Sequence, residues 1–250
     1  MQNDLKIVSL RETNADELHL AIAGREGYYI VKRMLDFIAA LALLALLSPL
    51  MALIALAIYI YSPGPVFFKQ ERVGSRRVRR GKNIYWQRQD FACYKFRTMK
   101  VNVDASIHEQ YVKALIQNDG KAMAAAQGGQ ETSVRKLVND PRIIRPGKLL
   151  RKLSLDELPQ FWNVLRGEMS LIGPRPAIPY EVQYYQPWHL RRLEAQPGLS
   201  GLQQVKARCT KNFDEQVRLD LEYIARQSFW LDLKIALKTP LAILFARGAY

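Results

Sequence analysis

The longest apolar run of the chain occupies residues 37–60, where 24 consecutive positions carry no charged side chain. As a straight helix this run would be about 36 Å long, enough to cross a hydrocarbon core of about 30 Å. A cleavable signal sequence is excluded, because the run begins too late in the chain and is too long. The pattern therefore predicts a long membrane helix.

Two features favour a helix that enters and leaves the membrane on the same side. Ser48 and Pro49 lie near the middle of the run, where proline removes a backbone donor and crowds the preceding turn. Lys32 and Arg33 precede the run and a basic stretch follows it, which favours two cytoplasmic ends. Each half would be about 16–20 Å long, a length that suits a hairpin within one leaflet. A kinked single span stays open, because spanning helices tolerate proline.

Beyond this segment the periodicity predicts a mixed domain dominated by helices. Residues 66–70 and 91–99 have the apolar patterns of short strands, whereas residues 104–140 are polar with helical spacing. A basic helix is expected near residues 148–152. From residue 228 onward the tail mixes apolar residues with lysines, which suits either a helix in the membrane interface or a core helix. The expected fold class is α+β, mostly helical, with a small sheet and amphipathic interfacial helices.

Charge adds a preference for anionic partners. The chain carries 37 Lys and Arg against 23 Asp and Glu, a formal net charge of +14, which favours nucleic acid, acidic lipid or phosphorylated substrates. Residues 69–82 contain seven basic residues and one acidic residue. Beside a membrane segment this stretch is expected to contact anionic head groups, with a solvated loop as the alternative. Aromatic residues are not interleaved with residues 72–82, which disfavours nucleic-acid binding.

Residues 154–157 combine a helix-start pattern with two adjacent carboxylates. Ser154 stands three residues before Glu157, a capping-box spacing that explains Glu157 without catalysis. The cations around them support a second interpretation, because a carboxylate at a helix start among cations stays ionised and can act as a nucleophile or a magnesium ligand. Adjacent side chains point about 100° apart, so Asp156 and Glu157 can share a ligand only over the helix end. The cations, which also suit a diphosphate, are Arg142, Arg145, Lys148, Arg151, Lys152, Arg166 and Arg175.

Other candidate chemistry is sparse. Arg175 stands between two prolines, whose fixed dihedral angles leave little entropy to lose when the guanidinium binds, although such arginines also occur in ordinary loops. The three histidines are scattered, so no metal triad is expected. Cys93 and Cys209 form neither a metal-spaced cluster nor a disulfide framework, which is typical of reduced thiols in a cytosol-facing protein. A glycine-rich phosphate loop is also missing from the sequence.

Taken together, several motifs resemble those of the bacterial sugar transferase family, the monotopic polyprenyl-phosphate phosphoglycosyl transferases. The resemblance covers about residues 32–250 in order, and its most specific part is the block SLDELPQ…MSLIGPRP. The other matching strings are KRMLDF, SPGPVFFKQERVG, YKFRTM, NDPRI, PGLSGLQQV and WLDLKIALKTP. The resemblance implies three parts: an N-terminal lead segment at residues 1–31, a re-entrant membrane helix at 32–61 broken at Ser48-Pro49, and a catalytic domain at 62–250. The catalytic domain would lie on the cytoplasmic face of the bacterial inner (plasma) membrane.

The resemblance also implies a reaction. A sugar 1-phosphate would pass from a nucleotide diphosphate sugar, usually a UDP-sugar, to undecaprenyl phosphate at the start of exopolysaccharide, O-antigen or other glycan assembly. Asp156 would attack the phosphorus and hold the phosphosugar, Glu157 would assist, and both would lie near Mg²⁺. A carboxylate nucleophile of this kind splits one difficult transfer into two easier ones. The implied phosphate-holding residues are Lys95, Arg151 and Arg175, and Arg145 and Arg208 are candidates for contacting the substrate or nucleotide.

Two departures from the family pattern and two alternative functions remain. Lys206 and Ala207 stand where the family usually has Asn and Gly, which leaves the donor sugar open, and residues 76–90 form a longer segment than usual. One alternative is a membrane-anchored basic adapter that binds anionic lipid or nucleic acid without catalysis, a role that would leave Asp156 dispensable. The other is a non-catalytic family member that serves as an assembly partner, which the intact carboxylates disfavour. A homo-oligomer is compatible with the sequence, and no nucleic-acid partner is expected.

Overall fold

The computed structural model describes residues 18–20, 25–101, 106–117, 119–126, 142–206 and 212–244. Its helices are α1 (Glu26–Tyr61), α2 (Ser106–Ile116), α3 (Gly120–Ala126), α4 (Arg145–Lys152), α5 (Gln160–Arg166), α6 (Pro179–Val182), α7 (Pro187–Leu190), α8 (Leu202–Lys206), α9 (Phe213–Arg226) and α10 (Phe229–Leu244), with 3-10 turns η1 (Leu155–Glu157) and η2 (Arg191–Leu193). The strands are β1 (Leu18–Leu20), β2 (Phe67–Arg80), β3 (Asn83–Phe96), β4 (Ser170–Ile172) and β5 (Gly198–Ser200), in two small sheets. The expected mostly helical fold with small sheets is confirmed.

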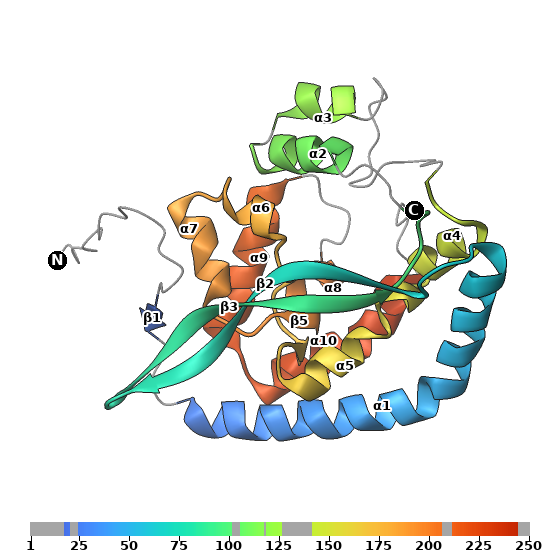
Figure 1. Cartoon of the computed structure of the whole chain (residues 1–250). Helices are drawn as coiled ribbons and strands as arrows, with labels where there is room; N and C mark the ends of the chain where they lie inside the picture. Colours follow the sequence, from blue (N-terminus) through green and yellow to red (C-terminus); the bar gives the residue numbers. More distant parts are fainter. Residues whose placement is uncertain are drawn as a thin grey trace.

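Helix α1 is long, apolar and bent. It begins at Glu26, ahead of the boundary expected at residue 32, and is 36 residues long, with Pro49 inside the helix. Figure 1 shows its first part running along one edge of the molecule and its last part turning away from that line. Pro49 explains the bend, because proline cannot donate to the preceding turn and its ring crowds that turn. Among the described residues, α1 is the one helix long and apolar enough to cross a membrane.

The polar start of α1 is fastened to the rest of the protein by ionic groups. Lys32 Nζ lies 2.8 Å from Asp232 Oδ2 of α10. Arg33 donates to two backbone carbonyls in the last turn of α5, at 2.5 and 2.7 Å. Asp36 accepts a hydrogen bond of 2.7 Å from the Ser170 hydroxyl at the start of β4. Each buried charge is therefore compensated, as burial requires, and the basic pair that precedes the apolar run also anchors α1 to the domain.

The basic stretch at residues 69–82 is a long hairpin rather than a solvated loop. β2 and β3 pair antiparallel over their full length, from Phe67 opposite Phe96 to Arg80 opposite Asn83. Gly81 has φ +61° in the turn, a conformation that glycine adopts without strain. The strands expected at residues 66–70 and 91–99 overlap two 14-residue strands, although residue 66 and residues 97–99 lie outside them.

β4 and β5 bring two distant sequence motifs into backbone contact. They pair in parallel, with Ser170 opposite Gly198 and Ile172 opposite Ser200. A Cβ on Gly198 would lie 2.0 Å from the Gly173 nitrogen, and a Cβ on Gly173 would lie 2.3 Å from the Gln196 carbonyl oxygen. Because no side chain fits at either position, these glycines allow the turn that carries Arg175 to pack directly on the segment before α8.

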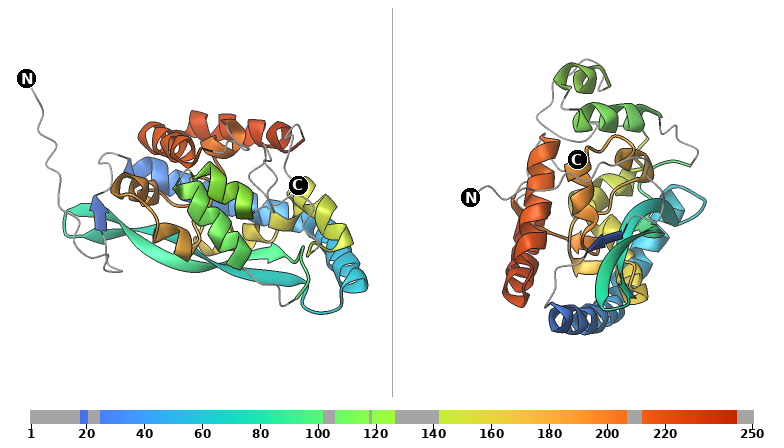
Figure 2. Two further views of the ribbon diagram at one scale, coloured as in Figure 1. Left: turned by 90° about the horizontal axis from the view of Figure 1, so that it is seen from above. Right: turned by 90° about the vertical axis from the view of Figure 1, so that its left-hand side faces the viewer.

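Helix α10 has one face buried in the core and an opposite face that exposes apolar side chains. Ile235 is buried in the core formed with Tyr223 and Ile224 of α9. The opposite side of α10 exposes Trp230, 81% accessible, together with Leu233, Leu237 and Leu241. The helix is thus a core element with an exposed apolar row. Helices α2 and α3 lie at the end of the molecule away from the first part of α1 (Figures 1 and 2).

Candidate active site

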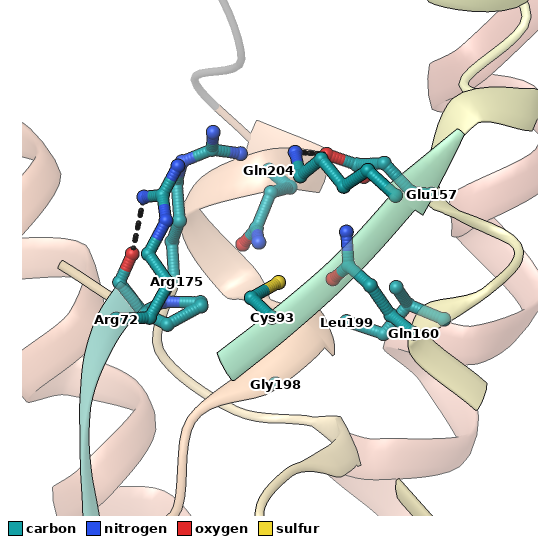
Figure 3. Close-up of a pocket in the computed structure, with 10 residues that line it drawn as sticks. Arg72, Cys93, Glu157, Gln160, Arg175, Gly198, Leu199 and Gln204 are labelled. Atoms are coloured by element: carbon teal, nitrogen blue, oxygen red, sulfur yellow. Dashed lines mark hydrogen bonds and ion pairs between the residues drawn. The ribbon is translucent and has the colours of Figure 1, made fainter. Parts of the chain in front are cut away.

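A cavity forms where the hairpin, η1 and the β4–β5 pair meet. Figure 3 shows Arg72 and Arg175 together on one side of it, with Glu157 and Gln160 on the other side. Three cationic side chains and one carboxylate face this space, so it favours an anionic ligand. The lining residues are Arg72, Cys93, Lys95, Glu157, Gln160, Arg175, Pro176, Gly198, Leu199 and Gln204.

Lys95 of β3 and Glu157 of η1 form an ion pair in the cavity. Lys95 Nζ lies 2.9 Å from Glu157 Oε1, and the two side chains are 15% and 26% exposed. This pairing fixes the carboxylate while leaving part of it open to the cavity. Lys95 is therefore placed to orient Glu157 and to contact a phosphate beside it.

The capping interpretation of residues 154–157 is wrong. Ser154 has φ 55°, in the left-handed region, and makes no side-chain capping hydrogen bond. The next residues form a 3-10 turn, and α5 begins only at Gln160 with Pro159 at its N-cap. Helix capping therefore does not explain Glu157, which lines the cavity instead.

Arg72 is a buried cation that the sequence analysis did not identify as a site residue. It is 6% exposed, and it donates to the Pro176 carbonyl at 2.9 Å and to the Gln70 side-chain oxygen at 2.5 Å. Its Nε is buried without a hydrogen-bond partner. Burial, followed by the charge of Arg175, lowers the pKa of the Arg72 guanidinium from its ordinary value. Two neighbouring guanidinium groups that repel each other are suited to a shared polyanion.

Asn163 of α5 positions the strand that carries Lys95. Its amide is fully buried; the oxygen accepts from the Tyr94 backbone N–H at 3.1 Å, and the nitrogen donates to the Ala92 carbonyl at 2.7 Å. The same nitrogen donates to Glu168 at 2.6 Å. These bonds fix β3 against α5 at Cys93, and so set the position of Lys95 two residues later.

Neutral groups complete the cavity. The Gln204 side-chain oxygen is buried without a hydrogen-bond partner, which leaves an acceptor for a ligand hydroxyl or amide. Burial raises the pKa of the Cys93 thiol, so this cysteine stays protonated and is a poor nucleophile.

Lys206, one of the departures from the family pattern, contacts Glu222 of α9 at 3.1 Å and does not line the cavity.

The structure brings together three of the residues expected at the site. Lys95, Glu157 and Arg175 line one cavity, although 80 positions separate the first from the last. Asp156 is half-buried and directly precedes Glu157 on η1, but it is not among the lining residues. Arg145 and Arg151 lie on α4, which leads into η1, and neither lines the cavity. Arg208 lies outside the described residues.

Sequence reasoning missed Arg72, Gln160 and Gln204. Arg72 was counted only as part of a basic stretch, and no local signal distinguishes it from its neighbours. Gln204 had a signal, because it belongs to the string PGLSGLQQV, which matches the family pattern.

The donor set is compatible with a magnesium ion that takes most of its ligands from a substrate. No cluster of three or more His, Cys, Asp or Glu side chains occurs in the described part of the chain. Asp156 and Glu157 supply hard carboxylate oxygens on one turn. Mg²⁺ is commonly bound by one or two carboxylates together with substrate phosphates and water. The residues present therefore fit this ion.

A cavity lined by three cations and the carboxylate of Glu157, in a chain with a long apolar helix, is typical of a membrane-associated enzyme that acts on phosphorylated substrates. The family model for "Bacterial sugar transferase" matches residues 27–246. The chain is 37% identical over 221 residues to the exopolysaccharide production protein ExoY of Rhizobium meliloti, covering 88% of each protein. The chain belongs to the bacterial sugar transferase family.

Two further relatives carry names that describe a reaction. The UDP-glucose:undecaprenyl-phosphate glucose-1-phosphate transferase of Caulobacter vibrioides is 37% identical over 227 residues, which cover 88% of this chain and 72% of that protein. The undecaprenyl-phosphate galactose phosphotransferase of Salmonella typhimurium is 35% identical over 252 residues, which cover 99% of this chain and 47% of that protein. The match thus extends over nearly all of the present chain.

Proposed function

We propose that this protein transfers a sugar 1-phosphate from a UDP-sugar to undecaprenyl phosphate, as the first membrane step of exopolysaccharide or lipopolysaccharide assembly. The observation that carries the proposal is the cavity that Arg72, Lys95 and Arg175 line together with the carboxylate of Glu157. A UDP-sugar and a polyprenyl phosphate both present phosphates to these cations. The names of the Caulobacter and Salmonella relatives support the same pair of substrates.

The reaction proceeds in two displacements at phosphorus, with Asp156 as the nucleophile. A carboxylate oxygen of Asp156 bonds to the sugar-linked phosphorus, the bond from that phosphorus to the UMP oxygen breaks, and UMP leaves with the electron pair. A phosphate oxygen of undecaprenyl phosphate then attacks the same phosphorus and releases the Asp156 carboxylate. The position of Asp156, one residue from the cavity lining on the turn of Glu157, supports this role.

The other site residues bind and orient. Arg72 and Arg175 hold the diphosphate of the donor, and the ion pair with Lys95 keeps Glu157 directed at the site. Arg151, on the helix that leads into η1, adds a further cation for the phosphates. Asp156 and Glu157 would hold Mg²⁺, which would neutralise phosphate charge. Fixed cations of this kind stabilise charge that develops in phosphoryl transfer.

The membrane arrangement follows from α1. Its bend at Pro49 and its exposed apolar surface support a re-entrant, monotopic helix that dips into the cytoplasmic leaflet. The exposed row of α10 and Trp162 of α5, 50% accessible, supply further apolar contacts at that surface. This arrangement brings the cavity near the head groups, where the phosphate of a polyprenyl carrier lies.

Release of nucleoside monophosphate tests the proposal. Membranes that contain the protein are incubated with undecaprenyl phosphate, Mg²⁺ and each member of a panel of nucleotide sugars. We expect UMP and a lipid-linked sugar diphosphate to form together with at least one UDP-sugar. Failure of every nucleotide sugar to yield its nucleoside monophosphate, with the protein intact in the membrane, would support the non-catalytic adapter instead.

A further inference from the structure

The distal end of the β2–β3 hairpin is a basic surface with few carboxylate partners among the described residues. We define the hairpin tip as residues 76–88, which contain six basic residues and no acidic residue. Only Arg88 has a carboxylate partner, Asp90 at 2.8 Å, in the described part of the chain. Arg76, Arg79, Arg80 and Lys82 are exposed. By contrast, the exposed Lys206 and Arg226 on α8 and α9 both pair with Glu222.

An aromatic contact fixes the hairpin tip beside the start of α1. The Arg77 guanidinium carbon lies 4.1 Å from the centre of the Tyr29 ring, and Tyr29 makes an edge-on contact with Trp86 at 5.5 Å. Trp86 is 3% exposed. The Tyr29 hydroxyl donates to the Gln227 side-chain oxygen at 2.6 Å. These contacts join the tip to the first turns of α1, and Figure 1 shows both at the same end of the molecule.

The apolar surface of α1 begins at this point. Ile30, Met34 and Ile38 follow Tyr29 along the helix and are 63%, 58% and 59% exposed. Apolar side chains of this kind enter the acyl region of a membrane, so the cations beside them lie at head-group level. The tip therefore adjoins the apolar surface where the phosphates of lipids are found.

We propose that the hairpin tip is a docking site for the anionic head groups of phospholipids, which sets the orientation of the protein on the membrane. Lys and Arg clusters beside a membrane segment are attracted to anionic leaflets, and salt screens the attraction. A single-stranded nucleic acid is disfavoured, because it requires exposed aromatic stacking platforms, whereas Trp86 is buried and Tyr85 is half-buried. The proposal rests on membrane association alone and not on the transfer reaction.

Fluorescence quenching at the tip tests this proposal. An environment-sensitive label is attached to Asn83→Cys, next to the turn, in the full chain with Cys93 and Cys209 replaced by serine. The protein is placed in nanodiscs of phosphatidylcholine with or without phosphatidylglycerol, both doped with a head-group nitroxide quencher. We expect several-fold stronger quenching in the anionic discs, decreasing as salt is raised from 0.1 M, where the screening length is about 10 Å, to 1 M, where it is about 3 Å.

Two matched variants show whether the tip cations cause the lipid-dependent quenching. Neutralising the tip should abolish the lipid-dependent quenching, whereas removing four exposed cations that lie outside the hairpin should not change it. Equal quenching in both kinds of disc, or an unchanged response of the tip variant, overturns the proposal. Protection of the label by single-stranded RNA, with no response to phosphatidylglycerol, also overturns it. The tip variant is Arg76, Arg79, Arg80 and Lys82 to Gln, and the control is Lys113, Lys121, Arg191 and Arg218 to Gln.

Turnover in nonionic detergent separates this test from the proposed function. The tip lies outside the cavity lining, so we expect the tip variant to keep the detergent-solubilised activity of the parent. Inactivity of the protein with its native cysteines, together with lipid-dependent quenching of the labelled protein, would refute the proposed reaction and leave the docking site in place. An active protein, together with a labelled protein that shows no lipid-dependent quenching, would refute the docking site and leave the proposed reaction in place.

Discussion

Replacing Arg72 by methionine should separate the stability of the protein from its activity. The guanidinium donates to the Pro176 carbonyl and to Gln70, and loss of such bonds to a charged group costs about 1.5–3 kcal/mol. The replacement also removes a buried charge that Arg175 repels, which saves an amount of similar size. The free energy of unfolding should therefore change by no more than about 2 kcal/mol.

Activity should fall far more than stability in this variant. Arg72 and Arg175 lie together on one side of the cavity (Figure 3), and charge-assisted contacts formed in the transition state contribute about 2–4 kcal/mol, or roughly 30- to 1000-fold in rate. UMP release gives kcat/KM, and thermal unfolding with and without UDP gives stability and ligand binding. Arg72→Lys keeps the charge without the planar fork and serves as the comparison. Parent-like kcat/KM and an unchanged UDP-induced shift in Arg72→Met would refute this reasoning.

Three other predictions follow from named contacts. Arg151→Ala and Arg175→Ala should each reduce turnover by roughly 30- to 1000-fold with little change in the unfolding midpoint, and activity within a few-fold of the parent would remove that residue from the site. Asn163→Leu should lower the free energy of unfolding by about 2–4 kcal/mol in thermal or chemical denaturation, because it breaks buried hydrogen bonds to Ala92, Tyr94 and Glu168. A smaller loss would show that β3 holds its position without Asn163. His189 is fully buried, and burial lowers its pKa from the ordinary value of about 6.5. As the pH falls, the unfolded chain therefore binds the proton first. The free energy of unfolding should decline below about pH 6.5, by at most about 1.4 kcal/mol per pH unit. His189→Gln should flatten that slope, and an identical slope in the variant would assign the effect to another group.

The long apolar helix and the helical tail could be predicted because each follows from local composition. The bend in α1 was also expected, since proline disrupts a helix wherever it occurs. The length of the hairpin was not, because an arginine-rich segment has the composition of a solvated loop. Its strand structure depends on pairing with β3, and on Arg77 packing against Tyr29 of α1.

The candidate site was predicted through resemblance more than through spacing. The spacing of Ser154 and Glu157 fits a capping box, yet the left-handed backbone at Ser154 leads into a 3-10 turn that directs Glu157 at the cavity. Arg72 could not be selected, because its role depends on contact with Pro176, 104 positions away. Lys95 was named only because its motif matched the family, whereas Glu157 and Arg175 were also candidates from their local patterns.

The covalent intermediate is the central claim of the mechanism, and mass spectrometry tests it most directly. The purified protein is incubated with a UDP-sugar that supports UMP release, in the absence of undecaprenyl phosphate, and then digested. The account predicts a sugar-phosphate adduct on the peptide that contains Asp156, and Asp156→Asn, which keeps the shape but replaces the carboxylate with a neutral amide, should form no adduct and have no turnover. Substantial turnover of Asp156→Asn, together with an unmodified Asp156 peptide in the parent, would contradict it and indicate direct displacement by the lipid phosphate.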